Sequence, residues 1–417
     1  MKLIWCITLL AVGVACNEQL DAGGSCPVLC PEQTLPIQEV TVDAIAVDTT
    51  LGPFPIRGTE QGLLLASRGD TLDVRGIVRY DSLPRTYLRL GATDTIAAID
   101  STHIYLRIDT AAVNFTGSAV IEAYDVDTTA TDTSTASVLP LFRPDRLLGS
   151  VTIQRQYFFL DDTVSIAMPD SVLLKSITTQ KPFRVGLRFV GNGDVTVQSV
   201  ETGLPALLRF RPAAGDSTIP MAAINPNSFS PSDNLPIATD LTDFSLIAKA
   251  APKPAVSLIA GGLPAYRSYF RFAIPAFYLD SVVVVRAQLV VVQRPLAGVV
   301  ADTDLATIYP VVVSATGAVT DLTRASEMVY AAQSFAIKPL VYAPRDSGER
   351  RIDMVQALRD WGSNSTTPAP RQTAIVLRGA NEGRAPGRLL FYGLDAPAAL
   401  RPKLVLSYVA RTRFGTP

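Results

Sequence analysis

The sequence has almost no histidine. His103 is the only one among 417 residues, and it lies between Thr102 and Ile104 in a pattern typical of a strand. Any Ser-His-Asp set must therefore use His103, and the chain has no Gly-x-Ser-x-Gly turn. Phosphate-binding loops and dinucleotide fingerprints are also absent. We expect His103 to be a partly exposed strand residue and the protein not to be an enzyme. A hydrolase that uses two carboxylates brought together by the fold is the one catalytic alternative left open.

The chain also lacks an excess of charge of either sign. It has 37 basic and 38 acidic side chains, so it has no field that would attract a phosphate backbone. We therefore expect no nucleic acid among its partners. After the first 15 residues no apolar stretch reaches the ~18 residues of a membrane span. The charged fraction is low, at 18%, and β-branched residues are frequent, which favours sheet over helix.

Cysteine is scarce as well. There are four, and two of them, Cys26 and Cys30, follow the N-terminal apolar run at close spacing. In an oxidising compartment these two are candidates for a small disulfide loop, with free thiols as the alternative. A metal site would need more ligands than two thiols.

What is present at the N-terminus is an export signal. Lys2 precedes a short apolar run that ends at Ala15, and Cys16 follows. This stretch resembles the bacterial lipoprotein signal, in which the cysteine carries the lipid. The resemblance implies a signal peptide over 1–15, lipidation of Cys16 and attachment to a membrane. Ordinary cleavage after Ala15 is the alternative. Asn17, in place of Asp, implies the outer membrane of the cell envelope.

The remainder reads as two similar halves. Residues 83–108 and 263–292 share Leu-Pro, a strand of alternating aromatic and Arg residues, a loop, Asp-Ser and a long β-branched strand. Two further pairs of segments follow in the same order, 183–194 with 373–383 and 204–210 with 400–408. Matched order over such a length indicates a tandem duplication.

The pattern predicts an all-β chain of two tandem jelly-roll-like β-sandwich domains, each with a short helix. Its predicted organisation is a lipid-anchored tether over 16–37, domain 1 over 38–212, a Pro-rich linker over 213–238 and domain 2 over 239–410.

Three elements are predicted in more detail. Residues 282–292 are nearly all apolar and predict a central strand. Asp353 can cap a helix on which Met354, Leu358 and Trp361 share a face, so Trp361 is expected to be a packing residue. A second helix is expected to begin after Pro169.

Three segments of the second half carry a family resemblance. They read IDMVQALRDWG at 352–362, TAIVLR at 373–378 and RPKLVLSY at 401–408. They resemble the DNRLRE-type family, whose members are β-sandwich modules of exported bacterial proteins and are similar to jelly-roll carbohydrate-binding modules. The resemblance implies a fold and an extracellular setting, and it does not assign a function.

Two groups of side chains are candidate binding residues. Asp125 and Asp127 in one loop, and Asp302 and Asp304 in another, are oxygen ligands of the kind that Ca²⁺ prefers, with ordinary turn chemistry as the alternative. No other cofactor is expected. Aromatic rings on or beside the strands are candidates for a glycan platform, with core packing as the alternative. These rings are Tyr87, Tyr105, Tyr269 and Tyr278.

The function expected from the sequence is therefore a non-catalytic one. A lipoprotein of the cell envelope would bind a glycan or an envelope protein through its sandwich domains. The alternative is a structural spacer or assembly component of the envelope.

Overall fold

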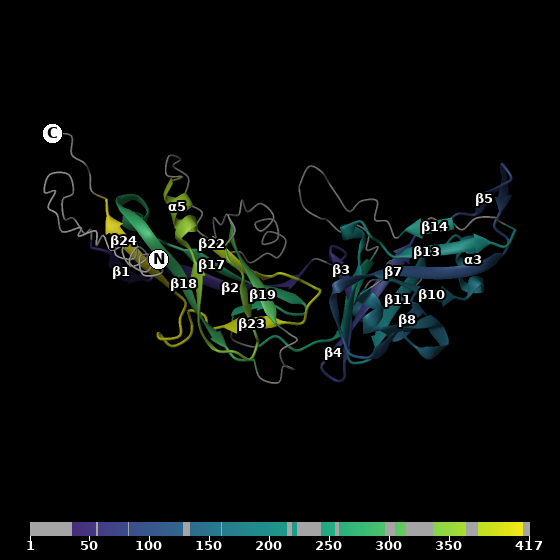
Figure 1. Cartoon of the computed structure of the whole chain (residues 1–417), viewed down its shortest axis with the longest axis horizontal. Helices are drawn as coiled ribbons and strands as arrows, with labels where there is room; N and C mark the ends of the chain where they lie inside the picture. Colours follow the sequence, from purple (N-terminus) through teal and green to yellow (C-terminus); the bar gives the residue numbers. More distant parts are fainter. Residues whose placement is uncertain are drawn as a thin grey trace, which may run out of the picture.

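The fold was taken from a computed structural model of the whole chain. It describes residues 36–55, 57–81, 83–127, 134–159, 161–214, 219–222, 243–254, 258–296, 305–313, 337–363 and 374–411. The chain is all-β, with two large antiparallel sheets and a few short helices. Figure 1 shows these sheets as two domains that lie next to each other along the long axis of the molecule.

The first domain is built on nine strands from the first half of the chain. They are β3 (Gly62–Arg68), β4 (Leu72–Tyr80), β7 (Ile99–Phe115), β8 (Ser118–Asp125), β9 (Leu147–Gln154), β10 (Thr163–Met168), β11 (Phe183–Val190), β12 (Gly193–Gln198) and β13 (Leu207–Pro212). The long strand β7 belongs to both layers of the sandwich. Its first part pairs with β10 and β13, and its last part pairs with β12.

The second domain is built on nine strands from the second half. They are β16 (Leu258–Gly261), β17 (Ala265–Phe272), β18 (Val282–Arg294), β19 (Ala306–Val313), β20 (Leu340–Tyr342), β21 (Gly348–Asp353), β22 (Ala374–Gly379), β23 (Arg388–Phe391) and β24 (Lys403–Ala410). Strand β18 covers the predicted central strand, which is confirmed.

The two sheets follow the same strand order. The first runs β13-β7-β12-β3-β4-β11-β8-β9, and the second runs β24-β18-β23-β16-β17-β22-β19-β20. Matching the strands by their order along the chain makes these two series identical. β10 and β21 also match, because each pairs with the long strand of its own domain.

Two further strands, which form an arm, complete each sheet. The N-terminal arm consists of β1 (Gln38–Val42) and β2 (Ile45–Phe54), and it pairs with β24 and β17 of the second domain. The middle arm consists of β14 (Ile219–Ala222) and β15 (Asp243–Lys249), and it pairs with β13 and β4 of the first domain. The two arms therefore occupy equivalent positions, one beside β24 and β17 and the other beside β13 and β4. Neither arm joins the domain that comes directly after it in the sequence.

This exchange changes the predicted organisation. Residues 38–54 belong to the sheet of the second domain, whereas the prediction placed them in domain 1. Residues 243–249 belong to the sheet of the first domain, whereas the prediction placed them in domain 2. The predicted linker over 213–238 contains β14 and joins two strands of one sheet. The first domain is thus inserted between the N-terminal arm and the rest of the second domain.

One predicted match between the halves is wrong. The strand of Arg and aromatic residues at 86–89 was matched with β17, but it forms β5 (Thr86–Arg89) of a separate hairpin with β6 (Ala92–Thr95). The strand that takes the place of β17 in the first sheet is β4, because both pair with an arm on one side and with β11 or β22 on the other.

The helices are short and lie mostly between strands. The expected helix of the first domain is α3 (Asp170–Thr179), which follows Pro169, and that of the second is α5 (Val355–Ser363). The Asp353 carboxylate accepts a hydrogen bond of 3.0 Å from the backbone N–H of Val355, as its predicted capping role requires. The other short helices are α2 (Thr135–Val138), η1 (Leu139–Leu141), η2 (Pro144–Arg146), η3 (Arg155–Phe159), η4 (Val200–Thr202) and η5 (Phe277–Ser281).

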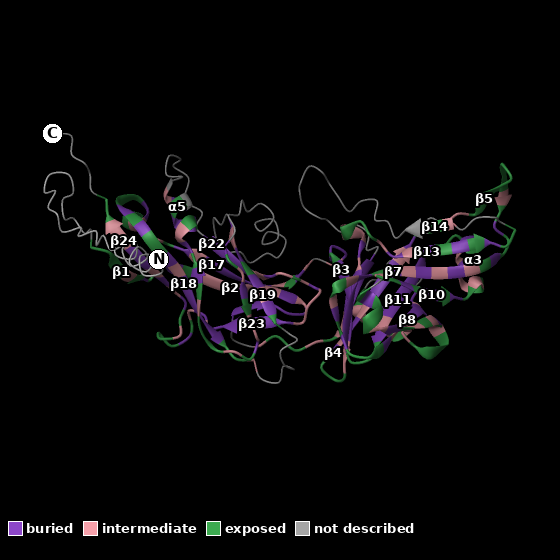
Figure 2. Ribbon diagram, in the orientation of Figure 1, coloured by how far each residue is buried: buried purple, intermediate pink, exposed green. Residues whose placement is uncertain are grey.

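Each domain has its own apolar core, and Figure 2 shows buried residues along the strands of both domains. Trp361 of α5 lies in the second core with Met354 and Leu358, and its ring centroid is 5.7 Å from that of Phe272. The predicted packing role of Trp361 is confirmed. A smaller apolar cluster joins the domains, because Leu263 of the second packs among residues of β3 and β4.

We expect the exchange to be visible in the effect of two substitutions. Leu246→Ala, in β15, opens a cavity at a fully buried site of the first domain, although the residue lies close in sequence to the second. Ile45→Ala, in β2, opens a cavity at a buried site in the core of the second domain. Each change should cost about 2–5 kcal/mol. Hydrogen exchange should accelerate over 62–222 in Leu246→Ala and over 258–410 in Ile45→Ala. Faster exchange over 258–410 in Leu246→Ala, or over 62–222 in Ile45→Ala, would contradict this placement of the arms.

Candidate functional site

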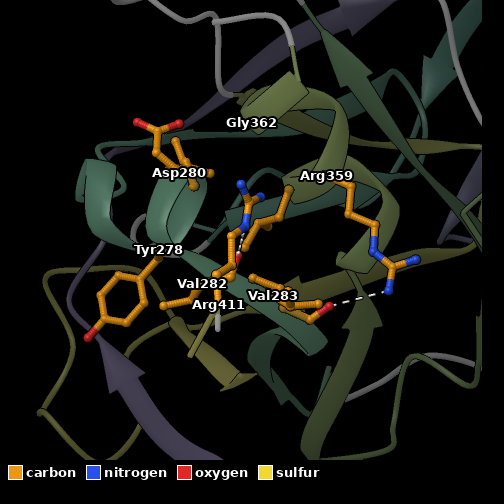
Figure 3. Close-up of a pocket in the computed structure, with 10 residues that line it drawn as sticks. Tyr278, Asp280, Val282, Val283, Arg359, Gly362 and Arg411 are labelled. Carbon is orange, nitrogen blue, oxygen red and sulfur yellow. Dashed lines mark hydrogen bonds between the residues drawn. The ribbon is translucent and has the colours of Figure 1, made fainter. Parts of the chain in front are cut away.

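Among the described residues, an open pocket in each domain combines arginine side chains with a tyrosine. The α5 pocket, in the second domain, has a volume of about 490 Å³. It lies between helix α5, the end of η5 and the start of β18 (Figure 3). Its lining residues are Tyr278, Leu279, Asp280, Val282, Val283, Val284, Leu358, Arg359, Gly362 and Arg411.

The two arginines of the α5 pocket are held by backbone carbonyls. Arg359 donates to the carbonyl oxygen of Val284 at 3.3 Å, and Arg411 donates to that of Val282 at 3.2 Å (Figure 3). Each bond uses only part of the guanidinium, which has five N–H donors. Both side chains are exposed, so the remaining donors are accessible to a ligand.

Tyr278 forms the aromatic side of the α5 pocket. Its ring centroid lies 5.3 Å from that of Phe277 and 5.4 Å from that of Tyr408. Phe277 and Tyr408 also contact each other, at 6.0 Å, so the three rings support one another. Phe277 is 51% exposed, which leaves an aromatic surface in water beside the arginines.

The β7–β13 pocket, in the first domain, has a volume of about 390 Å³. It lies on the outer face of the small layer formed by β10, β7 and β13, beneath the turn that follows η4. Its lining residues are Tyr105, Arg107, Thr163, Gly203, Leu204, Pro205, Leu207 and Arg209.

Strand pairing fixes the polar groups of the β7–β13 pocket. Leu207 of β13 lies opposite Tyr105 of β7, and Thr163 of β10 lies opposite Arg107. The guanidinium carbon of Arg209 is 4.7 Å from the centroid of the Tyr105 ring. Arg107 lies 3.6 Å from the Asp162 carboxylate in a half-exposed ion pair. The pocket thus offers cationic donors against a ring, an arrangement suited to a small anionic ligand with an apolar face.

The four candidate tyrosines do not form a platform on one sheet. Tyr269 is only 1% exposed, because it lies in the central strand β17, and it is therefore not available to a ligand. Tyr87 is half-buried on the β5–β6 hairpin and packs on the first core. Tyr105 and Tyr278 line the two pockets, one in each domain. His103 is half-buried on β7 beside Tyr105, with the ring centroids 6.2 Å apart, as expected for a strand residue.

The candidate calcium ligands are only partly described. Asp125 pairs with Arg146 at 3.2 Å and accepts a hydrogen bond of 3.0 Å from the backbone N–H of Asp127. Asp302 and Asp304 lie outside the described residues. Within the described ranges, no three His, Cys, Asp or Glu side chains are grouped to hold a metal ion. The lipidation candidate Cys16 and the disulfide candidates Cys26 and Cys30 also lie outside the described residues.

A cluster of three carboxyl groups was not predicted from the sequence. Glu60 and Asp243 are 5% and 2% exposed, and Glu201 lies near both. Glu60 accepts a hydrogen bond of 3.2 Å from the backbone N–H of Ser245, and Asp243 accepts one of 3.0 Å from that of Val200. The cluster therefore fixes the start of β15, which brings the middle arm into the first domain.

Burial makes these carboxyl groups weaker acids than exposed Asp and Glu side chains. It raises the pKa of Glu60 to about 7 and that of Asp243 to about 8, and repulsion from Glu201 adds to both shifts. Burial also raises the pKa of Glu201 itself. Neither of the two pockets is lined by any member of this cluster. The sequence pattern could not predict this cluster, because its three carboxyl groups come from three separate segments of the chain.

Within the described ranges, none of the helices has the length and apolar composition needed to cross a membrane.

Comparison with known proteins gives little further information. No family model matches the chain, and no curated protein matches it. One solved structure that matches is described as "Structure of infectious bursal disease virus Gx strain". It shares 10% identity over 92% of this chain and 79% of that chain, with a TM-score of 0.11. A score this low supports no statement about fold or function.

The carboxyl cluster predicts that stability falls as pH rises. In the unfolded chain Asp243 has an ordinary pKa of 3.8, whereas in the folded chain it is about 8. Between these values the folded state holds a proton that the unfolded state has released, so the free energy of unfolding decreases with pH across this window. Asp243→Asn removes that proton but keeps an oxygen for the Val200 N–H.

We therefore expect the urea midpoint of the wild type to fall between pH 5 and pH 9, and that of Asp243→Asn to fall less. Asp145→Asn is the matched control, since the Asp145 side chain is 64% exposed in an ion pair with Arg143. An equal fall of the urea midpoint with pH in wild type and Asp243→Asn would contradict the raised pKa of Asp243.

Proposed function

We propose that the protein is a non-catalytic, lipid-anchored protein of the bacterial cell envelope whose β-sandwich domains bind a glycan. The observation that carries this proposal is the pair of pockets, because each domain presents a tyrosine and two arginines around an open volume of about 390 or 490 Å³. Volumes of this size suit a small ligand or the end of a chain. Sugars combine an apolar ring face with hydroxyl groups, and both find partners in such a pocket.

The matching strand orders add a second argument. Two sheets with the same order, each completed by an exchanged arm, are consistent with the duplication inferred from the sequence. A duplicated domain gives two sites on one chain, and two linked weak sites retain a polymeric ligand far better than one. The resemblance to carbohydrate-binding modules agrees with this proposal but does not carry it, because no family is established.

A structural spacer is the second candidate, and the exchange of arms favours it. The chain crosses between the domains twice, and Leu263 packs across the junction. Arg384 of the second domain also lies 3.5 Å from Asp109 of the first. Such connections restrict the motion of one domain relative to the other, as a spacer requires.

A glycan-array screen of the mature protein distinguishes the two candidates. For a ligand found on the array, Tyr105→Ala and Tyr278→Ala should each weaken binding by about tenfold, the equivalent of about 1.4 kcal/mol. Tyr157→Ala is the control, because Tyr157 is 55% exposed on η3 and lines neither pocket. A folded protein that binds no glycan would favour the spacer.

The lipid anchor has its own test. Growth with a palmitate analogue should label the wild type and Cys26→Ser, and it should leave Cys16→Ser unlabelled, because only a cysteine at the cleavage site receives the lipid. Equal labelling of wild type and Cys16→Ser, or no labelling of either, would remove the anchor from the proposal.

A further inference from the structure

We infer that the β7–β13 pocket binds the carboxylate of an acidic saccharide, such as a uronate, and that Arg209 is the residue that binds it. This inference rests on the proposed function, since it names the class of glycan that one of the two sites takes. It depends on the partners of the arginines around the pocket, on the strand pairing beneath it and on the composition of its rim.

Arg209 differs from the neighbouring arginines on the same face of the sheet. Arg107 lies 3.6 Å from Asp162, and Arg211, two residues along β13, lies 3.5 Å from Asp100. The Arg209 side chain has no ion pair or hydrogen bond to any group in the part of the chain that the structure describes. Its guanidinium lies over the Tyr105 ring.

That contact orients the guanidinium without using its donors. A ring attracts the cation through its π face, whereas the N–H groups lie in the guanidinium plane and point outward. Restricting the side chain before binding lowers the entropic cost of holding a ligand. A planar carboxylate is the natural partner, because it accepts two parallel hydrogen bonds from one guanidinium.

The same contact disfavours a neutral sugar. A neutral pyranose would bind mainly by stacking on the Tyr105 ring, and Arg209 already lies over that ring. Displacing Arg209 would lose the cation–π contact and leave its charge with no partner. A ligand that brings its own negative charge keeps the contact and supplies the partner.

An extended peptide is disfavoured by the strand pairing. Peptides commonly add to a free sheet edge by main-chain hydrogen bonds. Strand β7 is paired with β10 on one side and β13 on the other, and β13 is itself paired with β14. Both edges of β7 and of β13 are therefore already paired, so recognition on these two strands comes from side chains.

The rim of the pocket suits a sugar ring. Leu204, which is 38% exposed, and Pro205 present apolar surface to the C–H face of a pyranose. The Thr163 hydroxyl donates to Asp162 at 3.0 Å, so its oxygen is still able to accept a hydrogen bond from a sugar hydroxyl.

Isothermal titration calorimetry on the mature protein tests the inference. The ligands are oligosaccharides of glucuronate and of galacturonate, each compared with the same oligosaccharide after reduction of its carboxyl groups to alcohols. We expect the acidic forms to bind at least about tenfold more tightly than the reduced forms, and their affinity to fall as salt is raised.

Substitutions assign the binding to this pocket. Arg209→Gln should weaken binding of the acidic form by at least about tenfold, whereas Arg211→Gln, its matched control on the same strand, should leave it unchanged. Tyr105→Phe should bind like the wild type, and Tyr105→Leu should bind less tightly, because only Phe keeps the ring. Unchanged melting temperatures show that each variant is folded.

The outcomes separate the inference from the function on which it rests. Equal affinity for acidic and reduced forms would overturn the inference and leave glycan binding intact. Unchanged binding by Arg209→Gln would likewise overturn it and move the site elsewhere. Tighter binding of acidic peptides than of any saccharide would overturn it in favour of a protein partner. Absence of binding to every saccharide would overturn both the inference and the proposed function.

Discussion

The structure depends on the exchange of strands between its two domains. Strand β2 forms a ladder with β17, and β15 forms a ladder with β4, so neither sheet is complete without its arm. Backbone N–H and C=O groups in a buried sheet must be paired, and the arms pair those of the central strands. The inner residues of the arms are also part of the cores, as with Ile45 in the second and Phe244 packed beside the first. The second domain is therefore assembled from two separated stretches of chain, whereas the first domain and its arm form one continuous stretch.

The two pockets lie on parts of the fold that are held firmly in place. The β7–β13 pocket lies on strands whose edges are closed by β10 and β14, and the α5 pocket lies where β18 meets a helix anchored by Trp361. Side chains on well-paired strands and packed helices keep their positions better than those on free loops. Arg107, Arg209 and Arg359 accordingly project from strands and a helix of the fold, and a ligand meets them already placed.

Parts of this structure could be predicted because local patterns determine them. The apolar run at 282–292 requires a buried strand, and the spacing of Met354, Leu358 and Trp361 requires a helix with one buried face. The exchange could not be predicted, because the strand pattern of β2 does not indicate which sheet it joins. Tyr269 and Tyr105 belong to similar alternating patterns, yet only the sheet order shows that Tyr269 lies in a strand covered on both faces. The contact of Arg209 with the Tyr105 ring was equally hidden, because it depends on the register between β7 and β13.

The insertion of one domain within the other also sets an order in time. The first domain and the middle arm form one continuous stretch of chain, so that domain can close before the last strands are available. The N-terminal arm is made first but pairs with strands made last, since Val42 lies opposite Leu404. At roughly 5–20 residues per second, the arm waits on the order of tens of seconds for its partner. During that interval its apolar residues are uncovered, which makes a nascent chain of this protein a natural client for a chaperone.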